Sequence, residues 1–138
     1  MSTLKVNSIQ NTVGVDLLTP IQSCRAKAWV NFDGTFGSSP FTVSNGGIRN
    51  AFNVTSVTDN GTGDYTVTFD NAMPNANYIV AGTCKQNDST SGGFIGIVIE
   101  GQTLANTYTT TSFRFSVLGL SSGNHFNAVV LNLVFFGD

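Results

Sequence analysis

The side chains that could perform acid–base or nucleophilic chemistry in this chain are few and scattered. His125 is the only histidine, and no nucleophile turn of the GxSxG kind accompanies it, so a Ser–His–Asp triad is not indicated. Most of the eight carboxylates stand beside Gly or Asn, where Asp commonly forms turns. Nothing in their spacing suggests the facing pair that a glycosidase requires. The sequence therefore predicts no catalytic centre and a protein that is not an enzyme.

Metal and cofactor sites are equally unsupported by the residue spacing. Cys24 and Cys84 lie in expected strands, and we interpret them as small buried hydrophobic residues, with a disulfide between them left open. No CxxC or HxxH pair is present, which disfavours a structural metal. The segment Asp59–Asp64, DNGTGD, lacks the Asp order and downstream Glu of a calcium loop, and it favours a hairpin turn. We expect no cofactor.

Composition points to one β domain with a charge-poor surface. The chain has 138 residues, with 11 Phe, 15 Gly and many Thr, Val and Asn, a balance that favours strands over helices. Charged residues make up 10 % and the net charge is −2, which leaves no basic patch for nucleic acid. Such a surface suits a protein that endures outside cells or packs against copies of itself. The first residues lack the apolar core of a signal peptide, so we expect synthesis in a cytoplasm.

The clearest strand pattern runs from Phe52 to Ala81. Phe52 and Val54 share one parity, the DNGTGD turn follows, and then Tyr65, Val67 and Phe69 alternate with threonines. Pro74, near two asparagines, marks a second turn before a third run that begins at Tyr78. This stretch predicts a three-stranded β-meander.

Strand-like runs elsewhere extend the prediction to the whole chain. Residues 23–33 alternate strictly, with the only Trp, Trp29, on the polar face, where we favour a subunit contact over a ligand platform. Phe94–Ile99 and Val129–Phe136 are apolar at nearly every position, so both of their faces must be covered. About eight strands predict an all-β fold, a single antiparallel β-sandwich of jelly-roll-like form. The domain would span residues 21–138 and follow an extended arm, residues 1–20. Because one small sandwich covers only one face of each sheet, we expect a homo-oligomer.

Three stretches carry a resemblance to a known family. They are STLKVNSIQN near the N-terminus, RAKAWVNFDG at residues 25–34, and FNVTSVTDNGTGDYTVTFDNAMPNANYIV at residues 52–80. Together they cover roughly half of the chain, and it resembles tail-fibre proteins of tailed bacteriophages, especially those of short-tailed phages that infect marine cyanobacteria and related aquatic hosts. The resemblance implies a virion protein of the phage tail, a homotrimer that attaches through its N-terminus to other tail or fibre proteins. Its exposed end would contact the host surface, either a glycan or an outer-membrane protein.

The resemblance and the strand pattern together nominate site residues. Virion attachment would involve Leu4, Lys5, Val6 and Ile9. Because loops carry binding on rigid β scaffolds, we expect receptor contacts in loops 86–93, 101–107 and 118–124, at Asn87, Asp88, Gln102, Asn106, Ser121 and Asn124. The expected trimer interface comprises Trp29, Phe94, Ile97, Leu131 and Phe135. For a glycan ligand, the candidate aromatic platforms are Trp29, Tyr78 and Tyr108.

Two other functions remain open at the level of the sequence. One is a structural virion protein, a capsid-decorating or neck component that touches no receptor. The other, which the absence of a carboxylate pair disfavours, is a small depolymerase of surface polysaccharide. Binding of the purified protein to host cells would separate receptor recognition from the structural alternative.

Overall fold

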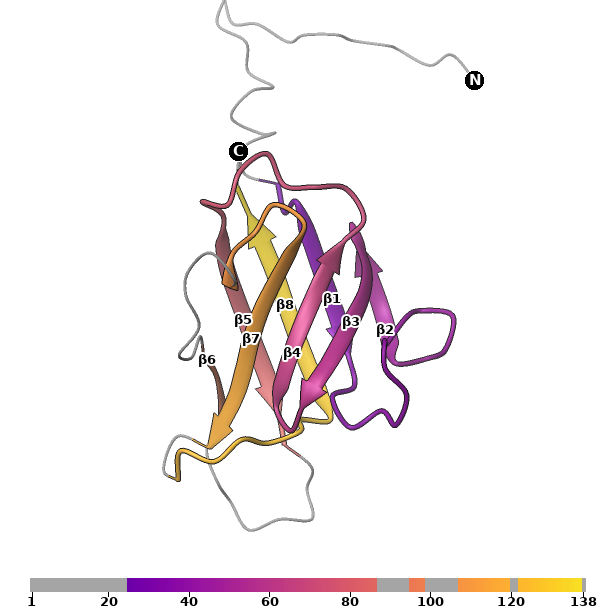
Figure 1. The fold of residues 1–138 in the computed structure, drawn as a ribbon, viewed down its shortest axis with the longest axis vertical. Coiled ribbons are helices and arrows are strands. Elements are labelled where there is room, and N and C mark those ends of the chain that lie inside the picture. The colour runs from indigo at the N-terminus through magenta and orange to yellow at the C-terminus, as the bar shows by residue number, and fades with distance from the viewer. Residues whose placement is uncertain (1–24, 87–94, 99–106, 120–121, 138) are drawn as a thin grey trace, which may run out of the picture.

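The computed structural model describes residues 25–86, 95–98, 107–119 and 122–137, and these form two antiparallel sheets of four strands each (Figure 1). One sheet has the strand order β2-β1-β8-β5 and the other β3-β4-β7-β6. The strands are β1 (Ala28–Phe32), β2 (Ile48–Phe52), β3 (Val54–Gly61), β4 (Asp64–Phe69), β5 (Ile79–Lys85), β6 (Ile95–Val98), β7 (Ser112–Gly119) and β8 (Val130–Phe136). The all-β, antiparallel prediction is confirmed.

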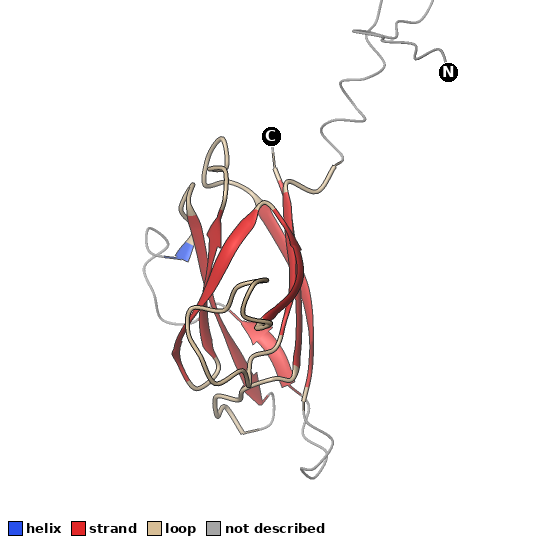
Figure 2. Ribbon diagram, turned by 90° about the vertical axis from the view of Figure 1, so that its right-hand side faces the viewer, coloured by secondary structure: helices blue, strands red, loops and turns tan. Residues whose placement is uncertain are grey.

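The two sheets pack face to face around an aromatic core (Figure 2). Strict alternation produces it, because every second residue of β1, β4, β7 and β8 points inward and is buried. Edge-to-face ring contacts join the two layers, for example Phe32 to Tyr65 and Phe69 to Phe135, with centroids 5.4 and 5.0 Å apart. The largest buried side chains are Tyr65, Phe32, Phe41, Phe113, Phe115 and Phe135.

The predicted hairpin at DNGTGD is confirmed as the β3–β4 connection. The strands pair from Val54↔Phe69 to Gly61↔Asp64, which leaves Thr62 and Gly63 at the tip. Gly63 has φ +66°, and a Cβ there would lie 2.8 Å from backbone atoms of Phe126 and Val117. Only glycine fits this position, because it must both adopt positive φ and lie against another backbone segment.

The prediction of a continuous meander is wrong at both of its ends. Phe52 and Val54 do not share a face, because Asn53 adopts φ 54° and moves the chain from β2 in one sheet to β3 in the other. Asn53 holds this turn with its side chain, which donates to the carbonyls of Lys27 and Asn71 and accepts from the Asn71 amide. The third run, β5, likewise leaves the hairpin and pairs with β8.

The strand with two apolar faces, β8, lies in the interior of its sheet between β1 and β5. Its inward residues Leu131, Leu133 and Phe135 are buried by the opposite sheet. Its outward residues Val130, Val134 and Phe136 are only half-buried. One subunit therefore covers one face of β8 and leaves the other partly open.

Candidate functional site: the outer face of one sheet

The outer face of the β2-β1-β8-β5 sheet, the side away from the core, carries side chains in cross-strand rows. Antiparallel partners share a face, so the pairings Trp29↔Phe52, Trp29↔Val134 and Ala81↔Val134 define one row. We call this the apolar row; its members are Phe52, Trp29, Val134 and Ala81. Beside it, Ile79 pairs with Phe136. Phe52 is 54 % and Ile79 69 % exposed, so a large apolar surface faces outward.

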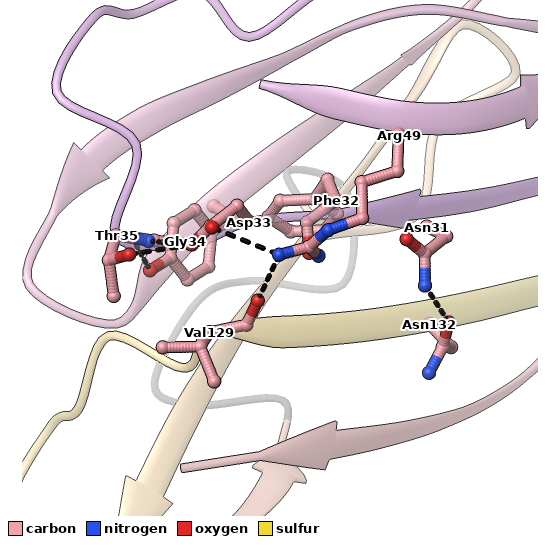
Figure 3. A network of polar contacts seen from close by, with 9 residues as sticks. Asn31, Phe32, Asp33, Gly34, Thr35, Arg49, Val129 and Asn132 are labelled. Atoms are coloured by element: carbon pink, nitrogen blue, oxygen red, sulfur yellow. Dashed lines mark hydrogen bonds and ion pairs between the residues drawn. The ribbon is translucent and has the colours of Figure 1, made fainter. Parts of the chain in front are cut away.

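A second row of polar residues runs parallel to the apolar row. The pairings Asn31↔Asn50, Asn31↔Asn132 and Thr83↔Asn132 define it; we call it the amide row, with members Asn50, Asn31, Asn132 and Thr83. The Asn31 Nδ2 donates to Asn132 Oδ1 (Figure 3). In turn, Asn132 Nδ2 donates to Thr83 Oγ1 over 3.1 Å. The row therefore forms a hydrogen-bonded ladder across three strands.

An open hollow lies across the two rows. Its volume is about 460 Å³, and its lining includes Trp29, Asn31, Ala81, Thr83, Asn132 and Val134. None of its lining residues carries a charge. An indole ring on one side and neutral amides on the other give the hollow the chemistry of a binding surface for an uncharged partner.

Arg49 lies next to the amide row, on β2, and contacts the chain at the end of β1 and just before β8. Asn31 pairs with Asn50 but Phe32 pairs with Ile48, so Arg49 is the extra residue of a β-bulge, a device that redirects a side chain. Its Nη1 donates to the Phe32 carbonyl over 2.9 Å, and its Nη2 contacts Asp33 Oδ2 at 2.9 Å and donates to the Val129 carbonyl at 2.7 Å (Figure 3). One guanidinium thereby ties β2 to the end of β1 and to the segment that enters β8.

The outer face of the opposite sheet is largely polar over β3, β4 and β7. The outward paired residues of β3, β4 and β7 include Ser56, Thr58, Asp64, Thr66, Thr68, Ser112, Arg114 and Ser116, and Leu118 at the end of β7 lies on the same side. Arg114 holds Asp64 through Nε at 2.9 Å and Nη2 at 2.5 Å. The hydrogen bond from Arg114 lowers the pKa of Asp64, against the opposing effect of burial. This face has the Ser, Thr and ion-pair chemistry of a solvated surface.

The structure places the predicted trimer-interface residues in two different environments. Trp29 lies on the outer face, as expected of a contact residue. Leu131 and Phe135 are fully buried in the subunit core, and Ile97 packs against that core. Leu131 and Phe135 face the core of their own subunit, because the sequence showed that their strand was apolar but not which side faced inward. The interface role of Ile97 stays a prediction. Phe94 lies outside the described residues.

The predicted receptor-contact and attachment residues mostly fall outside the described part of the chain. Asn124 is described and is exposed in the segment between β7 and β8. The others, together with Cys24, lie outside the described residues; they are Leu4, Lys5, Val6, Ile9, Asn87, Asp88, Gln102, Asn106 and Ser121. The domain boundary predicted at residue 20 also lies outside the described residues.

The remaining aromatic and sulfur candidates are parts of the core. Tyr78 is 5 % exposed and donates its hydroxyl to the Thr109 and Ser112 carbonyls, and Tyr108 packs against the same cluster. Neither is a surface platform for a sugar. Cys84 pairs with Leu131 on the inward side of β5, where burial raises the pKa of its thiol.

Sequence reasoning missed most of the outer face. The sequence analysis places Phe52 on the same face as Val54 and assigns no site role to Ile79, Val134, Phe136, Asn31 or Asn132. The available signal was the doubly apolar pattern of Val129–Phe136 together with the single Asn inside it. Locating its partners required the register of β1 and β5, which no local pattern encodes.

In the described segments, no group of three His, Cys, Asp or Glu side chains is placed to hold a metal ion. The same segments contain no helix long and apolar enough to cross a membrane. Comparisons of the chain with protein-family models, with curated proteins and with solved structures return no match.

Proposed function

We propose that this chain is a non-enzymatic attachment module of a phage virion, a tail-fibre or fibre-tip protein that assembles as a homotrimer and binds a host-cell surface receptor. The observation that carries the proposal is that the two ends of the sandwich differ. The described chain enters and leaves at one end, beside the β2–β3 and β4–β5 connections, while the β3–β4 turn and the segment between β7 and β8 lie at the other end (Figure 1).

The first end is suited to attachment. The strand β1 begins there, three residues after Arg25, and β8 ends there at Phe136 (Figure 1). The first described residues, which precede β1, therefore lie at this end. Attachment through Leu4, Lys5, Val6 and Ile9, which the resemblance implies, would hold the domain by this end and direct the opposite end away from the particle.

The opposite end presents neutral polar groups. The β3–β4 turn lies there, with Asn60 donating to Thr66 Oγ1 over 2.9 Å, and so does the segment that carries Asn124 and Asn127 (Figure 1). β5 ends and β6 begins at the same end, so the connection that holds Asn87 and Asp88 is anchored there. Amides both donate and accept hydrogen bonds, which suits the hydroxyls of a surface glycan or the loops of an outer-membrane protein.

Trimeric assembly would make weak contacts effective. Three copies aligned along the strand direction present three identical ends to one cell surface, so modest single-site affinity becomes strong avidity. The finer assignment is a jelly-roll-like sandwich, in which the first and last strands, β1 and β8, pair with each other. In such a fold the two termini lie together, as attachment at one end requires.

Blocking one end at a time tests the proposal. A folded fluorescent tag fused after Asp138 should leave binding to cells from a panel of aquatic cyanobacteria intact. The same tag inserted after Gly61, at the exposed tip of the β3–β4 turn, should abolish cell binding. The native mass of this fusion should still correspond to the same number of copies per assembly as in the untagged protein.

The control pair separates the alternatives. Equal binding by both fusions would place the receptor contact elsewhere on the molecule. Absence of binding by the untagged protein to every host tested would favour the structural virion component, and release of reducing sugar from host polysaccharide would favour the depolymerase.

A further inference from the structure

We infer that the outer face of the β2-β1-β8-β5 sheet is the surface through which copies of this chain contact one another, with an exposed apolar side chain of one copy seated in the hollow of the next. The inference rests on the homotrimer of the proposed function. It names the contact residues, and these differ from most of those expected from the sequence.

The contrast between the two outer faces is the first argument. Both sheets belong to one small sandwich and share one core, yet one presents Ser, Thr and an Asp–Arg pair outward, and the other presents Phe52, Trp29 and Ile79. An exposed group of large apolar side chains on one side marks an interaction surface. The polar face supplies the matched reference within the same molecule.

The outer face also carries both halves of a contact. The exposed side chains Phe52 and Ile79 lie on its two edge strands, β2 and β5. The hollow lies over β1, β8 and β5, between those edges. A projection and a cavity at different places on one face allow one copy to insert a side chain into another, and in the proposed trimer this contact runs head to tail from each copy to the next.

A second copy fits the charge and hydrogen bonding of the two rows, which lie beside Lys85 on the same side of β5. Neither row contains a charged residue, so a partner must offer a neutral face to avoid burying an unpaired charge. Each Asn amide has two donors and two acceptors, and the ladder uses only part of this capacity. A face with the same amides can satisfy the remainder, and this chain's own outer face is such a surface.

Native mass and the emission of the only tryptophan test the inference together. Trp29 lines the hollow, so burial by a neighbouring copy should shift its emission to shorter wavelength. Light scattering on a sizing column and the Trp29 emission should change in parallel as the wild-type protein is diluted. The matched variants are Ile79→Lys and Phe52→Lys, on the outer face, and Val43→Lys, a 58 % exposed apolar residue in the turn before β2.

The expected result is loss of assembly in the two outer-face variants only. Each should raise the concentration of half-dissociation by about thirtyfold or more, the change that corresponds to loss of one interface hot spot of about 2 kcal/mol. Val43→Lys should keep the wild-type mass. Because all three positions are exposed, each variant should retain the wild-type circular dichroism spectrum.

Each failure has a distinct reading. If both variants, Ile79→Lys and Phe52→Lys, keep the native mass of a trimer, the assignment of the contact face is wrong but the trimer itself is not contradicted. A monomeric wild type would overturn both the face and the trimer, and a Trp29 shift caused by chitotetraose in that monomer would reassign the hollow to a glycan. A wild-type trimer that dissociates as expected but binds no host cell would contradict the receptor-binding function alone.

Discussion

Single residues with buried polar groups show what strand patterns leave unspecified. Alternation in β4 predicted that Tyr65 faces inward, and it is fully buried. Its hydroxyl donates to the Gly34 carbonyl at 2.8 Å and contacts Asn127 Oδ1 at 3.0 Å. A Cβ on Gly34 would meet that hydroxyl at 2.5 Å. The two partners of the Tyr65 hydroxyl are 31 and 62 positions away in the sequence. Periodicity could therefore predict the burial of the ring but not the partners of its hydroxyl.

Stability should fall at alkaline pH because of the buried tyrosines. Burial raises the pKa of Tyr65 and of Tyr78 well above the ordinary value of 10.0. Above pH 10 the unfolded chain loses these protons while the folded protein keeps them, so their contribution is complete below pH 10 and is lost as the pH rises toward the folded-state pKa. The free energy of unfolding should decrease by about 1 kcal/mol per pH unit for each ring, measured by urea titration between pH 8 and 11.5.

The variant Tyr65→Phe separates this effect from the titration of lysines. Losing the hydroxyl should destabilise the protein at pH 8 by about 1–2 kcal/mol, because the Gly34 carbonyl loses its partner. It should also make the decline above pH 10 shallower. Tyr108→Phe is the control for a half-buried ring in the same core. An equal alkaline slope in wild type and Tyr65→Phe would show that this hydroxyl does not resist ionisation.

At the scale of the element, alternation predicted strands well and sheet membership poorly. Runs of period two located the hairpin and most of β1, because one buried face imposes that pattern directly, and the run that is apolar on both faces located β8. Nothing in the pattern distinguishes a strand that continues in the same sheet from one that crosses to the other. Between β2 and β3, the positive φ and the side-chain hydrogen bonds of Asn53 direct the chain from one sheet to the other. For this reason Phe52 was assigned to the wrong face.

Arg49 is an element-scale connector whose replacement should weaken one sheet without changing assembly. Because its fork reaches three acceptors on β1 and the segment before β8, a single ammonium cannot reproduce the contacts. Arg49→Lys should lower the free energy of unfolding by about 1–2 kcal/mol. Asp33→Asn, which keeps the two carbonyl contacts of Arg49, should cost less than 1 kcal/mol because that ion pair is exposed.

The measurement for these two variants is urea unfolding followed by far-ultraviolet circular dichroism. Both should keep the wild-type native mass, since the guanidinium contacts lie within one chain. Equal destabilisation by the two substitutions would assign the connection to the ion pair alone.

At the scale of the whole molecule, the excess of apolar strand surface was recognised from the sequence but assigned to the wrong side chains. The interior position of β8 lets the opposite sheet cover Leu131 and Phe135. The uncovered remainder is the outward set, Val134 and Phe136, joined by Trp29 and by residues of both edge strands. The argument that one sandwich cannot hide two apolar faces therefore holds for β8, and it now points to a defined surface.

A protein that lacks residues 1–20 should still assemble from three copies, because every residue of the proposed contact lies between Trp29 and Phe136. The truncated and full-length proteins should be compared by light scattering across a dilution series, since assembly depends on concentration. Their Trp29 emission should coincide at each concentration. A truncated protein that falls to monomer beside a trimeric full-length chain would transfer the assembly function to the N-terminal segment. Monomers in both would contradict the trimeric fibre itself, and the uncovered apolar row would then require a different occupant.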